Sequence, residues 1–438
     1  MSDHRKGPGD GAEPPGAEPS GAGGPVEKEQ WTDLQKEAKA KLETGRAGDD
    51  PDPNADVEHA DLRNPITWLP TVVETLVAIG LALLIGAVLI AFSDQEVIET
   101  LPYIFSYPQD FFRESWEAIS TSYAALVKGA VGSGPAIGTT VERAAPLICA
   151  GLGVSLAFRA GLFNIGAQGQ LIIGALLAGY VGFSWDLPSA LHLLLAFAAG
   201  LLGGAIWGAI AGILKAQTGA HEVITTIMLN FLAGSVLLYA LSKEAFQRPD
   251  SDNRLSPPAD ESARFTDVIG NTHWGVILAF IAAFAVWWLL ERSTLGFEIR
   301  AVGVNPDAAR TAGMSVPKIY TLAMMIAGLL AGLAATMSVL GRGDSLSPTM
   351  AGTIGFDAIT VALLGRATPL GTVLAGLLFG ALAVGGVAMQ ASAASTPKEL
   401  TQVLQALIVL FVAAPAFIRA ITGMKVQGSD TAMMAKGW

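Results

Sequence analysis

The chain has little formal charge for its length, since only 15% of its 438 residues are Asp, Glu, Lys or Arg. Residues 160–185 carry no formal charge, and about 20 mainly apolar residues are enough to cross a bilayer as a helix. Together with a mean hydropathy of +0.48, this composition argues against an ordinary soluble domain and is typical of integral membrane proteins.

Residue types and motifs that usually carry chemistry are also scarce. Cys149 is the only cysteine, so no disulfide can form within the chain. The five histidines are scattered and no HExxH motif occurs, which argues against a metal site. Neither Gly-Lys-Ser nor Gly-Lys-Thr occurs, so the phosphate-binding Walker A loop is missing. With no paired nucleophile and base and no basic stripe, we expect no enzyme activity of its own, no cofactor and no nucleic-acid partner.

What the sequence contains instead is a succession of apolar runs. They predict an all-α polytopic membrane protein with about ten transmembrane helices, nine to eleven being possible. The predicted spans are 71–92, 138–158, 164–184, 189–214, 223–241, 274–290, 319–340, 351–365, 369–390 and 401–418. The span at 351–365 is short and carries Asp357, so it could be a broken or re-entrant helix.

The charged residues predict how the chain is organised around the membrane. Residues 1–64 hold 15 acidic and 8 basic residues but few large apolar ones, which predicts a disordered acidic tail. Residues 65–425 form the predicted transmembrane domain, and 426–438 a short C-terminal tail. The positive-inside rule favours both tails in the cytoplasm.

Glycine is abundant and patterned. Gly200, Gly204, Gly208 and Gly212 repeat every four residues along the fourth predicted span. Small residues at this spacing allow helices in lipid to approach closely. Whether the ladder packs within the chain or against a second chain is left open.

A capped helix is predicted in the loop between the sixth and seventh spans. Asn305 is a good N-cap, Pro306 suits the first helical position, and Asp307 favours the positive end of the helix dipole. Gly313 is suited to the position after the C-terminus. We therefore expect a short cytoplasmic helix over 306–312, either docking on a partner or lying on the membrane surface.

Polar side chains also interrupt the apolar runs. Residues 163–170 read FNIGAQGQ and bring three amides to the start of the third predicted span. Asn164 and Gln168 are four residues apart and are expected to share one helix face. Amides at membrane depth need partners, so they mark either a hydrogen-bonded seam between helices or a path for a polar solute.

Four segments carry a resemblance to a known family: FNIGAQGQ at 163–170, GAHEVITTIMLNF at 219–231, GFEIRAVGVNPDAARTAGM at 296–314 and GFDAITVALLGRATPLGT at 355–372. The chain resembles the permease subunit of an ABC importer, in the branched-chain amino acid, ribose and nucleoside permease family. FNIGA-x-GQ points to the nucleoside and simple-sugar branch. The chain departs from the pattern at Gln168, where family members often carry Glu, and in its long acidic tail.

The resemblance implies a multi-pass permease of the cell (inner or plasma) membrane that moves a nucleoside or simple sugar inward. The implied partners are a separate ABC ATPase subunit, a second and related permease subunit forming a heterodimer, and an extracellular or periplasmic solute-binding protein. It also makes the loop helix similar to the coupling helix that docks on the ATPase, which would consist of Asn305, Pro306, Asp307, Ala308, Ala309, Arg310 and Gly313.

Candidate contacts for the solute are the polar and aromatic groups at membrane depth. A nucleoside or sugar offers several hydroxyl and amide groups to such side chains, and an aromatic ring can stack on it. The set is Phe163, Asn164, Gln168, Asn230, Phe356, Asp357 and Thr360. The alternative for each amide is a hydrogen bond to another helix. His221 and Glu222, at the start of the fifth span, fit capping or gating better than catalysis.

Two other functions remain open, and a third is disfavoured. A permease for branched-chain amino acids would belong to the same family. An ion-coupled secondary transporter would need intramembrane carboxylates or unwound helices, for which only Asp357 is suited, and it would leave the 305–313 helix unexplained. An intramembrane enzyme would need a catalytic constellation that the sequence does not contain.

Overall fold

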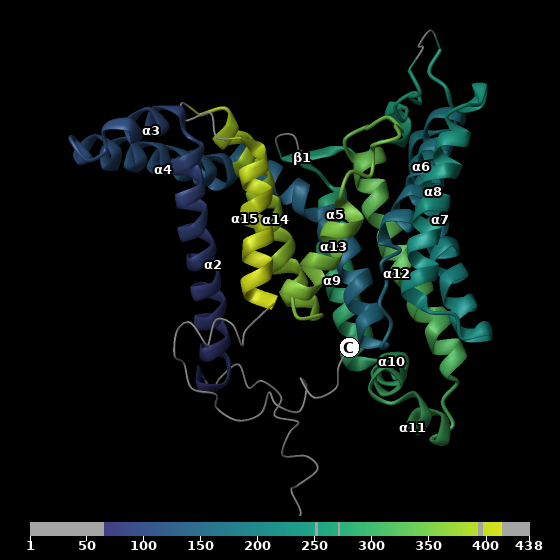
Figure 1. Ribbon diagram of the computed structural model, residues 1–438. Coiled ribbons are helices and arrows are strands. Elements are labelled where there is room, and N and C mark those ends of the chain that lie inside the picture. Colours follow the sequence, from purple (N-terminus) through teal and green to yellow (C-terminus); the bar gives the residue numbers. More distant parts are fainter. Residues whose placement is uncertain (1–64, 250–252, 270–271, 393–396, 414–438) are drawn as a thin grey trace, which may run out of the picture. The chain divides into compact units, whose positions relative to one another are not determined.

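The computed structural model describes residues 65–249, 253–269, 272–392 and 397–413 (Figure 1). The predicted tails at 1–64 and 426–438 lie outside the described residues. The description below concerns the compact unit Pro70–Val426.

Helices make up nearly all of the regular structure in this part of the chain. The α-helices are α2 (Pro65–Ser93), α3 (Gln95–Thr100), α4 (Pro108–Val131), α5 (Gly134–Arg159), α6 (Ala167–Ser184), α7 (Ser189–Thr218), α8 (Glu222–Ala240), α9 (Gly275–Arg292), α10 (Thr294–Val304), α11 (Pro306–Thr311), α12 (Val316–Thr336), α13 (Ile354–Leu364), α14 (Pro369–Gln390) and α15 (Lys398–Ala413). Single turns lie at Leu101–Tyr103, Glu244–Phe246, Glu261–Ala263 and, as a π-helix, Met337–Gly341, and β1 (Asp267–Ile269) pairs antiparallel with β2 (Thr272–His273).

The prediction of an all-α polytopic membrane protein is confirmed. Eight of the described helices are long and apolar enough to span a bilayer, and they match the first seven predicted spans and the ninth. Of the two remaining predicted spans, 351–365 contains the 11-residue helix α13, and 401–418 is described only as far as Ala413, the last described residue of α15. At 1.5 Å per residue, α13 covers about half of the roughly 30 Å hydrocarbon layer. The predicted span at 351–365 is therefore a short helix that does not cross by itself.

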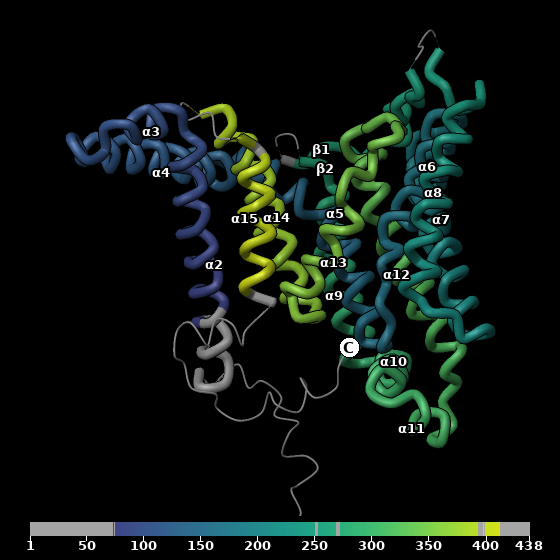
Figure 2. Tube along the Cα trace, in the orientation of Figure 1, coloured from purple at the N-terminus to yellow at the C-terminus, as the bar shows by residue number. Residues whose placement is uncertain are grey.

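The candidate spans run between two ends of the unit, which we name after the elements found there. The hairpin end holds β1 and β2, and the α11 end holds α10 and α11 (Figures 1 and 2). Helix α12 begins directly after α11, and the π-helical turn that continues it ends at Gly341, which lies against His273 of β2. Helix α5 runs the opposite way, from Gly138 beside Thr272 to Gly161 beside Gly303.

The glycine ladder packs within the chain, which answers the question that the sequence leaves open. A Cβ atom on Gly204 would overlap the carbonyl oxygen of Gly328 on α12, and one on Gly200 would overlap the side chain of Thr336. On the other side, a Cβ on Gly332 would overlap the carbonyl of Gly200. Small residues on both helices therefore bring the backbones of α7 and α12 into direct contact.

Three α-helices were not predicted: the short α3 and the longer α4 and α10. Helix α4 has Pro108 at its first position and Asp110 in its first turn. It buries Ala118 against α2 and α14 but leaves Phe112 and Trp116 largely exposed. Helix α10 is capped by Ser293, whose hydroxyl accepts a hydrogen bond from the Gly296 N–H at 3.0 Å. Helices α4 and α10 both mix polar and apolar residues, so a search for long apolar runs does not find them.

Candidate functional site

The segment between α5 and α6 is not helical, although the predicted span at 164–184 begins within it. Helix α5 ends at Arg159 and α6 begins at Ala167. Gly161 has a φ of +73°, a left-handed conformation that glycine adopts without steric cost and that ends the helix. Phe163 and Asn164 therefore precede α6, and the expectation that Asn164 and Gln168 share a helix face is wrong.

Asn164 folds this segment back onto itself. Its Oδ1 accepts a hydrogen bond from the Gly166 N–H at 2.9 Å, and its Nδ2 donates to Gln170 Oε1 at 3.1 Å. Asn164 and Gln170 are both 1% exposed. Buried amides are satisfied by hydrogen bonds, and this pair satisfies itself. In this conformation Asn164 holds the turn before α6 and does not reach an open surface.

Asn230, which comes from α8, supports the same turn. Its Oδ1 accepts from the Gly169 N–H at 2.8 Å, and its Nδ2 donates to the Ile165 carbonyl at 2.9 Å. Backbone groups at the start of a helix have no partner within the helix, and in lipid an unpaired group is expensive. The Asn230 amide supplies partners to one such donor and to a carbonyl just before the helix.

Gln168 connects the start of α6 to the start of α13. Its Nε2 donates to the Gly352 carbonyl at 2.9 Å, and its Oε1 accepts from the Gly355 N–H at 2.8 Å. Its neighbour Gln170 lies against Gly208, within the apolar part of α7. Both helix starts therefore meet inside the membrane-spanning part of the bundle.

Helix α13 has one packed face and one open face. Ala358 and Val361 are buried, and they lie against Gly151 of α5. On the other side Phe356 is 50% exposed, and Asp357 and Thr360 are half-buried. Gln168, Phe356, Asp357 and Thr360 are thus grouped around the first turns of α13. Phe163 is not in this group, because its ring packs on Phe158 with centroids 5.0 Å apart.

The carboxylate of Asp357 is held in place by a neighbouring hydroxyl. Thr353 Oγ1 donates to Asp357 Oδ2 at 2.7 Å, and the Asp357 N–H donates to the Thr353 carbonyl at 2.8 Å. Among the described residues, every ion pair joins other side chains, so Asp357 has no cationic partner there. A carboxylate at membrane depth normally faces other polar groups or water.

An irregular segment leads from the hairpin end to α13. It follows the π-helical turn of α12 and extends to Thr353, with positive φ at Gly343 and Gly352. Leu346 fixes it, since its N–H donates to Ser256 Oγ at 2.9 Å and its carbonyl accepts from the Ser256 N–H at 3.0 Å. Non-helical backbone within a membrane persists only where it is buried in protein or lines water, and residues 352–353 are exposed.

At the α11 end, the predicted loop helix is present as α11. Asn305 Oδ1 accepts from the N–H groups of Asp307 and Ala308, both at 3.1 Å, and Gly313 has a φ of +87°. The helix ends at Thr311, one residue earlier than predicted.

Only some of the residues predicted for the coupling helix are exposed. Ala309, one of them, is 4% exposed and belongs to the main core, so its side chain does not face a partner. The side chains of Asp307 and Arg310, paired at 3.0 Å, are 87% and 66% exposed. Val304, at the end of α10, is 76% exposed. The surface open to a partner is therefore an ion pair beside an apolar side chain.

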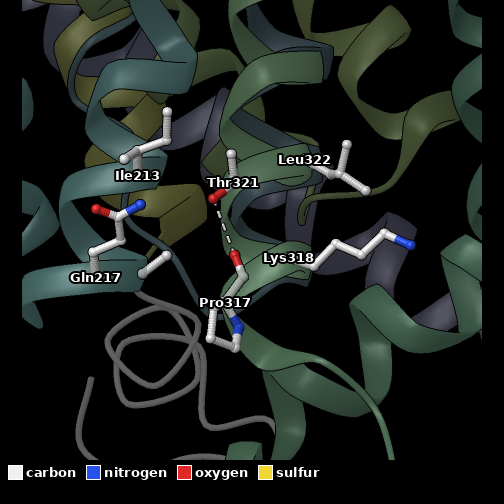
Figure 3. Close-up of a pocket in the computed structure, with 7 residues that line it drawn as sticks. Ile213, Gln217, Pro317, Lys318, Thr321 and Leu322 are labelled. Carbon is white, nitrogen blue, oxygen red and sulfur yellow. Dashed lines mark hydrogen bonds between the residues drawn. The ribbon is translucent and has the colours of Figure 1, made fainter.

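An open cavity of about 350 Å³ lies between α7 and α12 near the α11 end. Figure 3 shows its lining, in which Thr321 Oγ1 donates to the Pro317 carbonyl at 3.0 Å. The lining residues are Ile213, Ala216, Gln217, Pro317, Lys318, Thr321 and Leu322. None of them belongs to the group around Gln168. Nearby, Lys215 Nζ and Glu222 Oε2 form an ion pair at 2.8 Å that joins the end of α7 to the start of α8.

Comparison with known proteins identifies the family. The model of the branched-chain amino acid transport system permease component matches residues 136–413. The chain belongs to this permease family. The permease is 40% identical to the guanosine ABC transporter permease NupP of Bacillus subtilis, over 72% of this chain and 91% of NupP. It is 35% identical to the glucose ABC transporter permease TsgB13 of Haloferax volcanii, over 63% of this chain and 76% of TsgB13.

A second guanosine permease of Bacillus subtilis, NupQ, is 33% identical over 44% of this chain and 63% of NupQ. No solved structure matches the chain at a significant level. The family and these relatives make the chain a transport subunit, the permease of an ABC importer, with several membrane-spanning helices.

Proposed function

We propose that this permease moves a nucleoside or a simple sugar inward along the open face of α13. The observation that carries the proposal is the group formed by Gln168, Phe356, Asp357 and Thr360. These side chains line a helix that starts within the membrane and is reached through an irregular segment. Polar groups and a half-exposed ring suit a solute with several hydroxyl groups and an apolar face. The relatives named for guanosine and glucose support the same solute classes.

Fewer residues line the proposed path than the sequence predicted. Asn164 and Asn230 are occupied by the turn before α6, so we assign them to holding the helix start. Gln168 is also hydrogen-bonded, but to the rim of the α13 face. We propose that these hydrogen bonds break when α13 moves during transport, and that Gln168 contacts the solute only then.

Energy would come from a separate ATPase subunit that docks at α10 and α11. The sequence contains no Walker A loop, which supports an ATP site on another chain. The exposed Asp307–Arg310 pair and Val304 would form the contact. Because Ala309 packs into the main core, a displacement of α11 would be passed directly to the spans.

The remaining partners follow from the family and its pairs of permeases. Two guanosine permeases from one organism, NupP and NupQ, are both similar to this chain, which supports a heterodimer with a related permease. A solute-binding protein would deliver the solute at the hairpin end. This orientation puts α11 and both tails in the cytoplasm, and it agrees with the distribution of basic residues.

Co-purification combined with uptake tests the proposal. The tagged permease, expressed with its neighbouring transport genes, should bring down an ATPase chain, and the reconstituted complex should accumulate guanosine or glucose only with ATP and binding protein. An ion-coupled carrier would instead transport without an ATPase and would respond to an ion gradient. That outcome would refute the assignment.

A further inference from the structure

We propose that Asp357 recognises a pair of adjacent hydroxyl groups on the solute, so that it selects solutes carrying a vicinal diol. The inference rests on the proposed function, because it assigns a solute-binding role to one side chain of the α13 face. It goes further by naming the chemical group that is recognised and the residue that positions the carboxylate.

The first argument is the incomplete set of partners around Asp357. An ionised carboxylate has two oxygens and about four acceptor sites. In the described residues only Thr353 Oγ1 donates to it, at 2.7 Å to Oδ2. No ion pair reaches it there, and its side chain lies on the half-open face of α13. A carboxylate in this environment requires further donors.

The second argument is what those donors must be. A carboxylate accepts hydrogen bonds and donates none, so it favours a solute that presents two O–H or N–H groups side by side. Guanosine and glucose, the solutes named for two relatives, differ in almost everything except adjacent hydroxyl groups. A path that serves either class would use what they share. Hydrogen bonds to a charged acceptor are also roughly twice as strong as neutral ones.

The third argument is the arrangement of the neighbours. Thr353 lies one turn before Asp357, and its bond to Oδ2 leaves Oδ1 without a described hydrogen bond. Phe356 is adjacent in sequence and 50% exposed, so its ring could cover the apolar face of a sugar or a base. Thr360, one turn later on the same face, adds a hydroxyl group. Thr353 is therefore a positioning residue, and Asp357 the group that touches the solute.

The test compares uptake of a parent solute and its deoxy analogue by the wild type and by variants. The complete importer is reconstituted with its ATPase, partner permease and binding protein, and the binding protein is saturated with each solute. Guanosine is compared with 2′-deoxyguanosine, and glucose with 2,4-dideoxyglucose, because neither analogue keeps two adjacent hydroxyl groups. The ratio of wild-type to Asp357→Asn uptake is measured for each solute, with uptake normalised to permease abundance. This ratio cancels the preference of the binding protein, which is the same in both assays.

We expect Asp357→Asn to lower uptake of the parent solute by about tenfold or more. Uptake of the deoxy analogue should fall by no more than about twofold. Thr353→Val should change the two solutes in the same direction but less. Asp186→Asn, an exposed carboxylate in the α6–α7 loop, is the matched control and should leave both unchanged.

Each outcome decides between the proposals. Equal losses for the parent solute and the deoxy analogue, or no loss for either, would overturn the diol assignment while leaving the importer function intact. A fall in abundance that accounts for all lost uptake would assign Asp357 to folding and overturn it as well. A wild-type importer that carries no member of a panel of nucleosides and simple sugars would overturn the proposed function itself.

Discussion

Replacing Ala309 by proline is the sharpest perturbation of α11. The Ala309 N–H donates to the Asn305 carbonyl at 3.0 Å, and this is the first bond of the helix. Proline has no N–H and its ring clashes with the carbonyl four residues earlier, at a cost of about 3 kcal/mol. The ring must also fit where the alanine side chain is only 4% exposed. A cost of that size lowers the equilibrium constant for folding α11 by more than about a hundredfold.

Ala309→Pro should therefore abolish the stimulation of ATP hydrolysis by loaded binding protein, whereas membrane insertion should survive because none of the eight candidate spans includes α11. Ala309→Gly, which costs about 1 kcal/mol in a helix, should give an intermediate loss. The assay is coupled ATPase activity in proteoliposomes, with permease abundance measured by immunoblot. Normal stimulation in the proline variant would refute the docking role of α11.

Three further predictions concern the bundle. Gly204→Ala should lower abundance in the membrane, because the added Cβ would overlap a backbone carbonyl of α12. Gly234→Ala is the control, since a Cβ there would have no neighbouring atom within 4 Å. Equal abundance of the two variants would contradict the α7–α12 packing. Gln168→Leu should reduce uptake more than it reduces abundance, because its bonds to the start of α13 are proposed to open during transport and one interhelical bond is worth only about 0.6 kcal/mol. An equal fall in uptake and abundance would assign Gln168 to helix packing. Glu222→Gln should weaken the 2.8 Å ion pair between α7 and α8 and raise solute leakage in a flux assay without ATP, and unchanged leakage would exclude a gating role.

Much of the fold could be predicted because its signals are local in the sequence. Apolar runs locate the eight candidate spans, since lipid exposure demands apolar side chains over about 20 residues. The ends of α11 could be predicted from Asn305 and Gly313, because capping depends on neighbouring backbone groups. The four-residue glycine spacing indicated close packing, although only the structure shows that the partner is α12.

Less of the candidate site could be predicted from the sequence, because the site depends on where the backbone leaves the helix. The average hydropathy of 164–184 is that of a span, and nothing in it reveals that Gly161 turns the chain and that Asn164 caps the turn. The partner of Gln168 lies 187 residues away at Gly355, a distance that no local pattern encodes. The burial of Ala309 was missed for the same reason, since it depends on α11 docking against the core.

Photo-cross-linking from Arg310 tests the central claim most directly. A photoreactive amino acid at Arg310, exposed on α11, should link covalently to the ATPase subunit in membranes of cells that express the whole importer. The same group at Asp260, exposed at the hairpin end, should instead link to the solute-binding protein or to nothing. If Asp260 captured the ATPase, or if Arg310 captured no ATPase in a complex with normal ATP-driven uptake, the proposed docking and orientation would be contradicted.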